Sequence, residues 1–245
     1  MGDKPMQDIV LDAAELTYAG DSEPVFCDLN ARFNQGQWSV LVGRSGCGKT
    51  SLLRYLAGLL SDEEVTWAAN STINTLDVAY MAQQDLLLPW LSVLENVCLS
   101  GRFSPQKTDL KERALALLSE VDLLAAKDLL PSQLSGGMRQ RVALARTLIQ
   151  DKPVVLMDEP FSALDAVTRY QLQNLAAKLL KNKTVVLITH DPQEAYRLGH
   201  RVYLMQGKPA KAIELAVKDS DIPRPIDADL AQFQQQMLSQ LEKQS

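Results

Sequence analysis

The sequence predicts an α/β fold with a mainly parallel sheet, a small antiparallel β-subdomain and an inserted helical subdomain. Three apolar runs, at residues 38–42, 154–157 and 185–188, are typical of strands buried on both faces. Between them, the stretch from residue 92 to about 150 shows apolar residues at helical spacing. Residues 7–33 instead indicate short strands separated by turns. Ligands of open α/β sheets bind at the carboxyl ends of the strands, so the residues after each run are the first site candidates.

The first apolar run ends in G-x-x-x-x-G-K-[ST], the pattern of a phosphate-binding P-loop, which comprises Gly43, Arg44, Ser45, Gly46, Cys47, Gly48, Lys49 and Thr50. Glycines allow successive backbone N–H groups to form an anion nest, and the following helix points its positive N-terminus at the same place. Lys49 can reach the β- and γ-phosphates, and the Thr50 hydroxyl can ligate Mg²⁺. The alternative is a chance glycine turn before a lysine, which average composition allows in on the order of one percent of such chains.

Length and composition exclude several classes of protein. The 245 residues allow one large domain, or one domain with an inserted subdomain. A net charge of −5 argues against a nucleic-acid surface, which needs a basic stripe. No apolar run reaches the roughly 18 residues of a membrane span, and the first residues lack the features of a secretory signal. The three cysteines show no metal-ligand spacing, which fits a reducing cytoplasm, so we expect any membrane role to come through a partner.

Capping signals divide the predicted helices. Ser92 and Glu95 form an S-x-x-E capping box, and Thr108 can cap the helix that follows it. The tripeptide Ser-Gly-Gly at residues 135–137 opens another helix and, taken alone, is usually only a cap and a turn. Residues 191–194 form a D-x-x-E cap with proline at the first helical position.

Groups with binding or catalytic chemistry follow each of the buried strands. Beyond the P-loop, Asp158 and Glu159 follow the second run and His190 follows the third. Asp158 is placed to hold Mg²⁺, and Glu159 can orient or deprotonate an attacking water. His190 seen singly would more often be a satisfied core histidine, but its place beside the same pocket favours a γ-phosphate contact. Tyr18 stays open between an edge-strand aromatic and a ring that stacks on a base.

These motifs together resemble the ATP-binding subunit of an ABC transporter. The run LSGGMRQR at residues 134–141 matches the signature of that family and does not occur in other P-loop enzymes. The order of motifs also matches: an A-loop aromatic, the P-loop, a Q-loop glutamine, the signature, the acidic strand end, the D-loop at 162–165 and a switch histidine. The resemblance covers about residues 8–215 and implies a P-loop NTPase core of the ABC ATPase type that hydrolyses ATP with Mg²⁺.

The resemblance implies a role for each candidate residue. Tyr18 would stack on adenine, Glu159 would be the general base, His190 would contact the γ-phosphate, and Gln83 would sense Mg²⁺ and water. The phosphate cradle would comprise Gly43, Arg44, Ser45, Gly46, Cys47, Gly48, Lys49, Thr50 and Ser51. The metal ligands would be Thr50, Gln83 and Asp158, and the remaining nucleotide contacts would be Ser135, Gly136, Gly137 and Asp165. Ser135 and Gly137 would close over the nucleotide of a second copy, in a head-to-tail dimer that sandwiches ATP.

One stretch is more particular. Residues 87–97, LLPWLSVLENV, are similar to importers of nitrate, sulfonates, taurine and the hydroxymethylpyrimidine precursors of thiamine, and MAQQD at 81–85 is similar to the pyrimidine-precursor members. The resemblance therefore implies a small solute such as a thiamine-precursor pyrimidine, with sulfonate, taurine or nitrate as alternatives. The implied partners are a second copy, transmembrane permease subunits and, indirectly, a solute-binding protein, at the cytoplasmic face of a bacterial inner membrane.

The expected domain layout is an ABC ATPase domain at 1–217, with the helical subdomain at about 84–150, and a helical tail at 218–245. Residues 61–74 lack the usual glycine-containing strand turn, so we expect the antiparallel β-subdomain to be trimmed there. The chain past residue 215 is too short for the regulatory domain of sugar importers. A non-transport ABC ATPase is the alternative function, but such proteins usually carry two cassettes, long coiled coils or a basic face, none of which this sequence shows.

Two further hypotheses concern Cys47 and the connector at residues 83–91. Cys47 lies inside the phosphate nest beside Lys49, so it would be a reactive thiol protected by nucleotide, with a small filler residue as the equal alternative. Residues 83–91 form an unusually apolar connector that would dock on a membrane partner with Trp90 as its anchor. The alternative for this connector is packing between the two subdomains.

Overall fold

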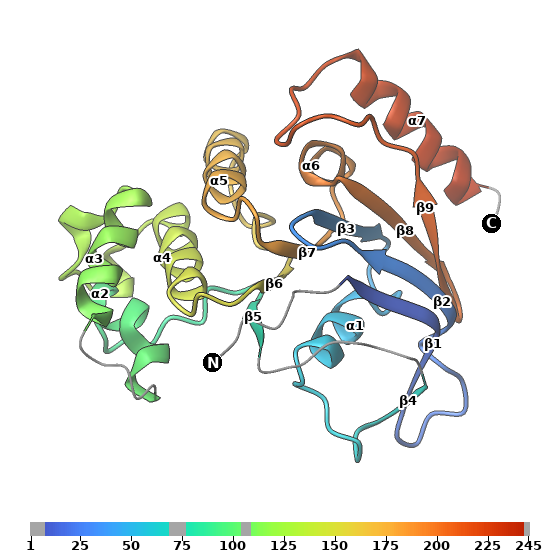
Figure 1. The fold of residues 1–245 in the computed structure, drawn as a ribbon, viewed down its shortest axis with the longest axis horizontal. Helices are drawn as coiled ribbons and strands as arrows, with labels where there is room; N and C mark the ends of the chain where they lie inside the picture. The colour runs from blue at the N-terminus through green and yellow to red at the C-terminus, as the bar shows by residue number, and fades with distance from the viewer. Residues whose placement is uncertain (1–7, 69–76, 104–108, 243–245) are drawn as a thin grey trace.

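The computed structural model of the protein describes residues 8–68, 77–103 and 109–242, which form one nine-stranded sheet with helices on both faces (Figure 1). The strands are β1 Ile9–Tyr18, β2 Phe26–Phe33, β3 Trp38–Gly43, β4 Val65–Ala68, β5 Val78–Met81, β6 Val154–Asp158, β7 Thr184–Thr189, β8 Arg201–Gly207 and β9 Ala210–Leu215. The helices are α1 Lys49–Leu56, α2 Val93–Val97, α3 Leu110–Glu120, α4 Gly136–Leu148, α5 Ala166–Leu179, α6 Pro192–Leu198 and α7 Ala228–Glu242, with 3₁₀ turns at Cys98–Phe103, Leu124–Ala126 and Pro131–Gln133. Among the described helices, none combines the length and apolarity that a membrane crossing requires.

The sheet has a parallel half and an antiparallel half, in the order β4-β1-β2-β9-β8-β3-β7-β6-β5. β8, β3, β7, β6 and β5 are parallel neighbours, whereas β1 pairs antiparallel with β2 and β4. The β8–β9 hairpin joins the halves, because β9 meets β2 in a single parallel pair. The predicted α/β class is confirmed. Because β3, β7 and β6 are adjacent and parallel, their carboxyl ends bring the predicted loops to one edge.

The all-apolar strands are explained by burial on both faces. β3 and β7 are buried along their whole length. Val40 and Val42 point into a cluster that residues of α5, α6 and α7 complete, while Leu41 points into a second cluster with α1 and the antiparallel strands. Figure 1 shows α6 and α7 above the sheet and α1 below it. This alternation is what a period of two gives to a strand between two layers.

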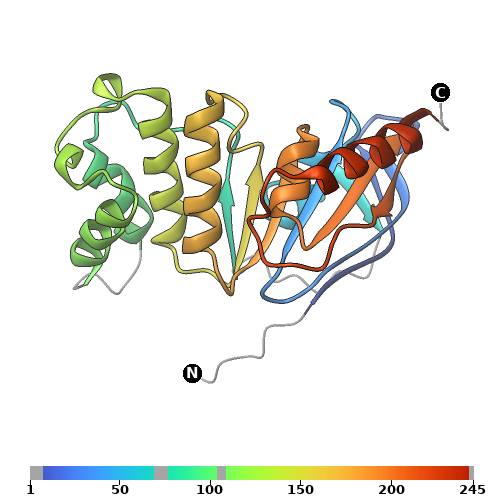
Figure 2. The ribbon, with the colours of Figure 1, turned by 90° about the horizontal axis from the view of Figure 1, so that it is seen from above.

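The helical subdomain stands beside the sheet and packs around a cluster of its own, which includes Val93, Val97, Leu118 and Val142. The predicted capping box at the start of α2 is present. Thr108 lies outside the described residues, and α3 begins after Asp109. In Figure 2, α4 and α5 run side by side, so that α4 connects the subdomain to the core.

The trimming predicted for residues 61–74 stays a prediction, because the structure describes only residues 61–68 of that stretch. Within the described part, β4 forms and pairs with β1. Trp67 gives the physical reason. It stacks on Tyr55 of α1, with 3.9 Å between ring centroids, and meets Phe26 of β2 edge-on. Aromatic packing thus stabilises this edge strand without a glycine turn, and residues 69–74 lie outside the described part.

The predicted C-terminal helix is present as α7 and packs on the core. Leu230, Phe233 and Met237 are buried, and Phe233 contacts the ring of Tyr196 in α6. Leu238, which shares the helical spacing, is 57% exposed, so the buried face is narrower than the pattern predicts. Through α6, the tail supports the strand and loop that carry the switch histidine.

Candidate functional site

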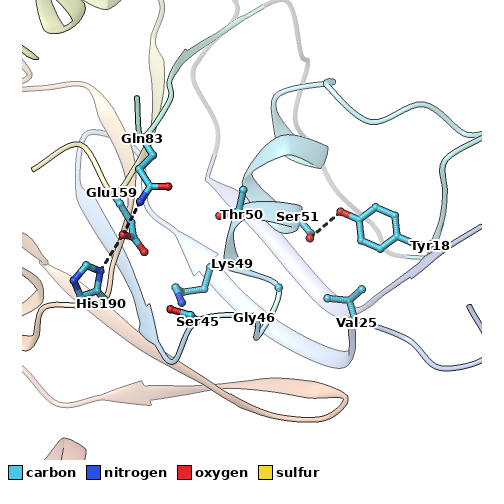
Figure 3. A pocket seen from close by; sticks show the side chains of 11 residues that line it. Tyr18, Val25, Ser45, Gly46, Lys49, Thr50, Ser51, Gln83, Glu159 and His190 are labelled. Carbon is cyan, nitrogen blue, oxygen red and sulfur yellow. Dashed lines mark hydrogen bonds and ion pairs between the residues drawn. The ribbon is translucent and has the colours of Figure 1, made fainter. Parts of the chain in front are cut away.

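A cavity of about 550 Å³ opens at the carboxyl edge of the parallel strands, within the size range of ligand pockets (Figure 3). It is lined by Tyr18, Val25, Ser45, Gly46, Gly48, Lys49, Thr50, Ser51, Gln83, Glu159 and His190. The structure thus brings together the P-loop, the Q-loop glutamine, the candidate base and the switch histidine. Arg44 and Cys47 line a smaller cavity on the other side of the loop, together with the turn between β8 and β9.

The P-loop has the backbone that its glycines require. Gly46 and Gly48 have φ of +82° and +89°, and a Cβ on Gly48 would lie 2.5 Å from a side-chain carbon of Val25. No other residue type fits there without strain. Lys49 is buried at the start of α1, and its Nζ donates to the carbonyls of Gly43 and Arg44 at 2.8 and 2.9 Å. The ammonium is therefore held within the loop that would surround a phosphate.

Asp158 ends β6 and is hydrogen-bonded through both oxygens. Thr50 Oγ1 donates to Oδ1 and the Tyr80 hydroxyl donates to Oδ2, each at 3.1 Å. Burial raises the pKa of Asp158, and the two donors oppose that rise. Burial and the neighbouring carboxylate raise the pKa of Tyr80 to about 12, so the phenol stays a donor. The Tyr80 contact was not predicted, because a tyrosine inside a strand gives no sign of its cross-strand partner.

The oxygens of Thr50 and Asp158 suit a hard cation such as Mg²⁺. Among the described residues, no group of three or more His, Cys, Asp or Glu side chains could hold a metal by itself. A cation here would therefore need oxygens from a bound phosphate and from water. The third predicted ligand, Gln83, donates through Nε2 to Glu159 at 3.3 Å.

Glu159 occupies an unusual backbone conformation at the edge of the cavity. Its φ is +46°, in the left-handed region that non-glycine residues rarely adopt, and its N–H donates to the Ile188 carbonyl of β7 at 3.0 Å. Its Oε2 lies 2.9 Å from His190 Nδ1 and accepts the Gln83 bond, as Figure 3 shows. Strained residues of this kind often occur at functional sites. The carboxylate is thus aimed, at its strand end, by groups from two other segments.

The signature and D-loop residues lie away from this cavity. Ser135 accepts a hydrogen bond from Met138 N and caps α4, and Asp165 caps α5. Neither they nor Gly136 and Gly137 line the P-loop cavity of the described chain. A single chain therefore does not bring the signature to its own P-loop.

Gly137 also has a packing role inside the chain that its motif did not reveal. A Cβ on this residue would lie 2.6 Å from Thr168 Cγ2, so α4 and α5 approach more closely than a side chain allows. Substitution of Gly137 would disturb this contact as well as any ligand contact. Ser135 is therefore the better residue for testing the signature.

The start of the connector is clamped by α4, which the sequence did not predict. Gln140 Nε2 donates to the Gln83 carbonyl at 3.3 Å, and Arg139 Nε donates to Asp85 Oδ2 at 3.0 Å. Arg146 donates to the Asp85 carbonyl. Two of these donors, Arg139 and Gln140, belong to the signature run at 134–141. The polar residues of that run were the one sign in the sequence of a contact with the connector. Any movement of Gln83 is consequently shared with the signature helix.

Tyr18, Cys47 and the connector at residues 83–91 are the remaining candidates, and the structure supports them to different degrees. The Tyr18 hydroxyl donates to Ser51 Oγ at 2.9 Å and its ring lines the cavity; stacking on a base stays a prediction. Cys47 is only 8% exposed and packs in the cluster around α1, which favours the filler alternative. In the connector, Leu87 is buried in the helical subdomain, whereas Trp90 is 71% exposed. The packing alternative therefore holds for Leu87 and not for Trp90.

Known proteins that resemble this chain are ATP-binding components of ABC transporters, and the profile of the ABC transporter family matches residues 26–162. An uncharacterized ABC transporter ATP-binding protein of Haemophilus influenzae is 40% identical over 232 residues, which are 93% of this chain and 96% of that protein. The aliphatic sulfonates import ATP-binding protein SsuB 1 of Xanthomonas axonopodis pv. citri is 39% identical over 229 residues, 89% of this chain and 90% of the relative. The dimeric structure of MJ0796, a bacterial ABC transporter cassette, has a TM-score of 0.72 at 29% identity and covers 86% of this chain and 100% of its own. The same cassette in a post-hydrolysis state bound to ADP and Pi gives the same values.

Proposed function

The chain belongs to the ABC transporter family as an ATP-binding, ATP-hydrolysing subunit, and we propose that it works as a head-to-tail dimer that powers a solute importer. One observation carries the proposal: Lys49, Gln83, Glu159 and His190 converge on one cavity, while Ser135 lies outside it. A second copy facing the first would set its signature helix against that cavity. The helix N-terminus would then add its positive end to the phosphate site.

In the proposed reaction, the P-loop backbone and Lys49 bind the β- and γ-phosphates. Glu159 takes a proton from the attacking water, whose oxygen bonds to the γ-phosphorus as the bond to the β–γ bridging oxygen breaks. Gln83 and His190 hold the Glu159 carboxylate toward the cavity. Thr50 and Asp158 are the residues that would hold Mg²⁺, which neutralises phosphate charge when bound. The general base contributes roughly 10²–10⁴-fold in such reactions.

Gel filtration of the purified chain with and without MgATP tests the dimer. The proposal predicts a shift from monomer to dimer that needs nucleotide, because the second half of each site comes from the other copy. An ordinary P-loop kinase or small NTPase would show no such shift. If both the wild-type chain and Glu159→Gln stay monomeric at saturating MgATP, the proposed assembly is wrong.

The connector at residues 83–91 is the proposed docking site for the permease, which would place the subunit at the cytoplasmic face of a bacterial inner membrane. Trp90 and Leu86 are exposed at 71% and 58%. Because Gln140, Arg139 and Arg146 clamp the start of the connector to α4, a permease seated there would follow movements of the signature helix. Docking would therefore turn ATP binding into a displacement of the membrane subunits.

Trp90→Ala tests the docking, since aromatic anchors at interfaces often contribute 2 kcal/mol or more. We expect the variant to lose co-purification with its permease and to lose uptake, while its isolated form still binds ATP. Leu59→Ala is the matched control, because Leu59 is a large apolar residue of 55% exposure outside the connector. Unchanged uptake by Trp90→Ala would place the docking site elsewhere.

For the cargo we propose a small organic sulfonate, supported by the relative named as an aliphatic sulfonates import protein. A pyrimidine precursor of thiamine is the second candidate, and only the stretch at 81–85 favours it. The complete importer, purified through this chain and placed in proteoliposomes with its binding protein, decides between them. ATP hydrolysis stimulated by an alkanesulfonate supports the first; stimulation by hydroxymethylpyrimidine alone supports the second.

A further inference from the structure

Arg169, at the start of α5, joins two loops that the proposed mechanism uses separately. Its Nη2 donates to the carbonyl oxygen of Leu164 in the D-loop at 3.0 Å. Its Nη1 donates to Asp191 Oδ2 at 3.2 Å, one residue beyond His190. A planar guanidinium can hold two acceptors in a fixed geometry, which a lysine cannot do. One side chain therefore ties the D-loop to the segment of the switch histidine.

A buried hydrogen-bonded frame holds the same segment from the other side. Thr189 Oγ1 donates to Glu194 Oε2 at 2.6 Å and accepts from the N–H of Asp191 at 3.0 Å. Gln173 Nε2 of α5 donates to the other oxygen of Glu194 at 3.2 Å, and Arg169 Nε lies 3.9 Å from it. The D-x-x-E pattern predicts a capping box between Asp191 and Glu194, but Glu194 does not form it. Its carboxylate anchors Thr189, so both neighbours of the histidine are held.

The surroundings of His190 make this anchoring relevant to its orientation. The imidazole itself is more than half exposed and its one hydrogen-bonding contact in the described structure is Glu159. Its direction is consequently set by the backbone between Thr189 and Asp191. A shift of Asp191 would change the distance between the imidazole and the carboxylate, now 2.9 Å. Arg169 can shift Asp191, because within residues 8–68, 77–103 and 109–242 it is the side chain that bonds to both loops.

We propose that Arg169 is a positioning residue that transmits the position of the D-loop to the switch histidine. The inference rests on the proposed function, in which the D-loop belongs to the half of the chain that meets the second copy and His190 belongs to the nucleotide cavity. When the second copy displaces the D-loop, the Leu164 carbonyl carries the guanidinium, and Asp191 moves with it. The alignment of His190 on Glu159 then depends on a complete dimer.

The test begins with Arg169→Gln, which keeps most of the side-chain length. The change removes the positive charge and the pair of N–H donors that hold Leu164 and Asp191. We expect kcat for ATP to fall about 10-fold to 100-fold, the effect of a small misplacement of a catalytic group. KM for ATP should change by less than about threefold, because the P-loop is untouched. Arg169→Lys keeps the charge but lacks the planar pair of donors, so its kcat should lie between those of the wild type and Arg169→Gln.

Two comparisons separate positioning from a merely structural role. Arg201→Gln is the matched control: Arg201 donates twice to Glu214, at 2.7 and 2.6 Å, and is 25% exposed against 31% for Arg169, but it lies outside the cavity. It should lose a similar amount of thermal stability and keep its kcat. Asp191→Asn retains the cap of α6 and loses the ion pair with Arg169, so it should reproduce the kcat loss even where Arg169→Gln folds poorly.

Glu159→Gln distinguishes failure of this inference from failure of the proposed function. If Glu159→Gln abolishes turnover and dimerises in MgATP, while Arg169→Gln and Asp191→Asn hydrolyse ATP as fast as Arg201→Gln, the coupling role is wrong and the function stands. If Glu159→Gln keeps near-normal turnover, the proposed function is wrong. The double variant Glu159→Gln/Arg169→Gln should still dimerise with MgATP, because Arg169 acts on alignment and not on assembly; loss of that dimer would overturn the inference.

Discussion

The P-loop and the signature loop are built alike and surrounded differently. Each places glycines at the N-terminus of a helix, α1 or α4, where backbone N–H groups attract an anion. Lys49, at the first, lines a cavity together with a base, a histidine and a glutamine from other segments. Ser135, at the second, is exposed and bonds within its own helix. The chain thus holds most of one nucleotide site and a signature loop that lies outside that site, and this difference supports the proposed two-chain active unit.

The two regions also differ in how they are anchored. The P-loop follows β3 at the centre of the sheet and is held by buried strands on both sides. The signature helix belongs to a subdomain with its own core and is tied to the Q-loop through Gln140 and Arg139. Two parts with separate cores, joined by a few hydrogen bonds, suit the proposed rotation of one part against the other.

The largest effect is expected from Glu159→Gln, which keeps size and hydrogen bonding but cannot accept a proton. Turnover of ATP should fall by about 10²–10⁴-fold, and gel filtration in MgATP should show a trapped dimer. Glu120→Gln, on the exposed surface of α3, is the control and should behave as the wild type. Near-normal turnover in Glu159→Gln would refute the assignment of the base.

Ser135→Asp tests the signature half without disturbing its fold. Aspartate caps a helix as well as serine does, so α4 should keep its stability, but the added charge would repel the phosphates of a nucleotide on the second copy. Steady-state hydrolysis should fall at least about 10-fold, while ATP binding to the monomer, measured by titration calorimetry, stays unchanged. Ser135→Asn, a neutral cap, should retain most activity. Equal activity of both variants would mean that no phosphate approaches Ser135.

Arg139→Gln weakens the link between the regions and should have a smaller effect. The change removes the bond to Asp85, in the Q-loop, and the bond to the Leu134 carbonyl beside the signature. Changes along a coupling network typically alter the coupling by about 0.5–2 kcal/mol, so we expect a few-fold loss of transport-coupled hydrolysis in the full importer. Lys127→Ala removes an exposed ion pair of the same subdomain and should have no effect. If Lys127→Ala loses as much transport-coupled hydrolysis as Arg139→Gln, the bonds of Arg139 have no particular role in coupling.

Asp158→Asn should have the smallest effect, and on stability. Burial raises the pKa of Asp158 in the folded chain above its unfolded value. Ionisation therefore costs stability at pH above both pKa values, and the cost disappears as the pH falls through the raised pKa. Without nucleotide, Asp158→Asn should unfold at higher urea than the wild type at pH 7, by about 0.5–2 kcal/mol in free energy. The advantage should shrink on acidification; the exposed Asp122→Asn should show neither effect.

The parts of the fold and site that could be predicted are those set by local pattern. The P-loop, Asp158, Glu159 and His190 follow buried strands, and adjacent parallel strands bring their carboxyl ends to one edge, so their convergence follows from the pattern. The capping box at Ser92 is local in the same sense. Periodicity and this cap depend on residues a few positions apart, so both are preserved in the fold.

The parts that could not be predicted depend on packing between distant segments. Tyr80 of β5 reaches Asp158 of the neighbouring strand β6, and Trp67 stabilises an edge strand where the turn signal is missing. Glu194 has the spacing of a cap but is drawn into the core by Thr189. In each case the partner lies on another element, so neither spacing nor propensity contains the information. The same holds for Arg169, whose two acceptors are loops that precede different helices.

The measurement that tests the two-chain site most directly is complementation between defective subunits. Lys49→Ala, which loses the P-loop function, and Ser135→Asp, which loses the signature function, should each be nearly inactive alone. Mixed in equal amounts with MgATP, they should recover about a quarter of wild-type hydrolysis, because about half of the dimers are mixed and each has one intact site. A mixture as inactive as the separate variants would contradict a site shared between a P-loop of one chain and a signature of the other.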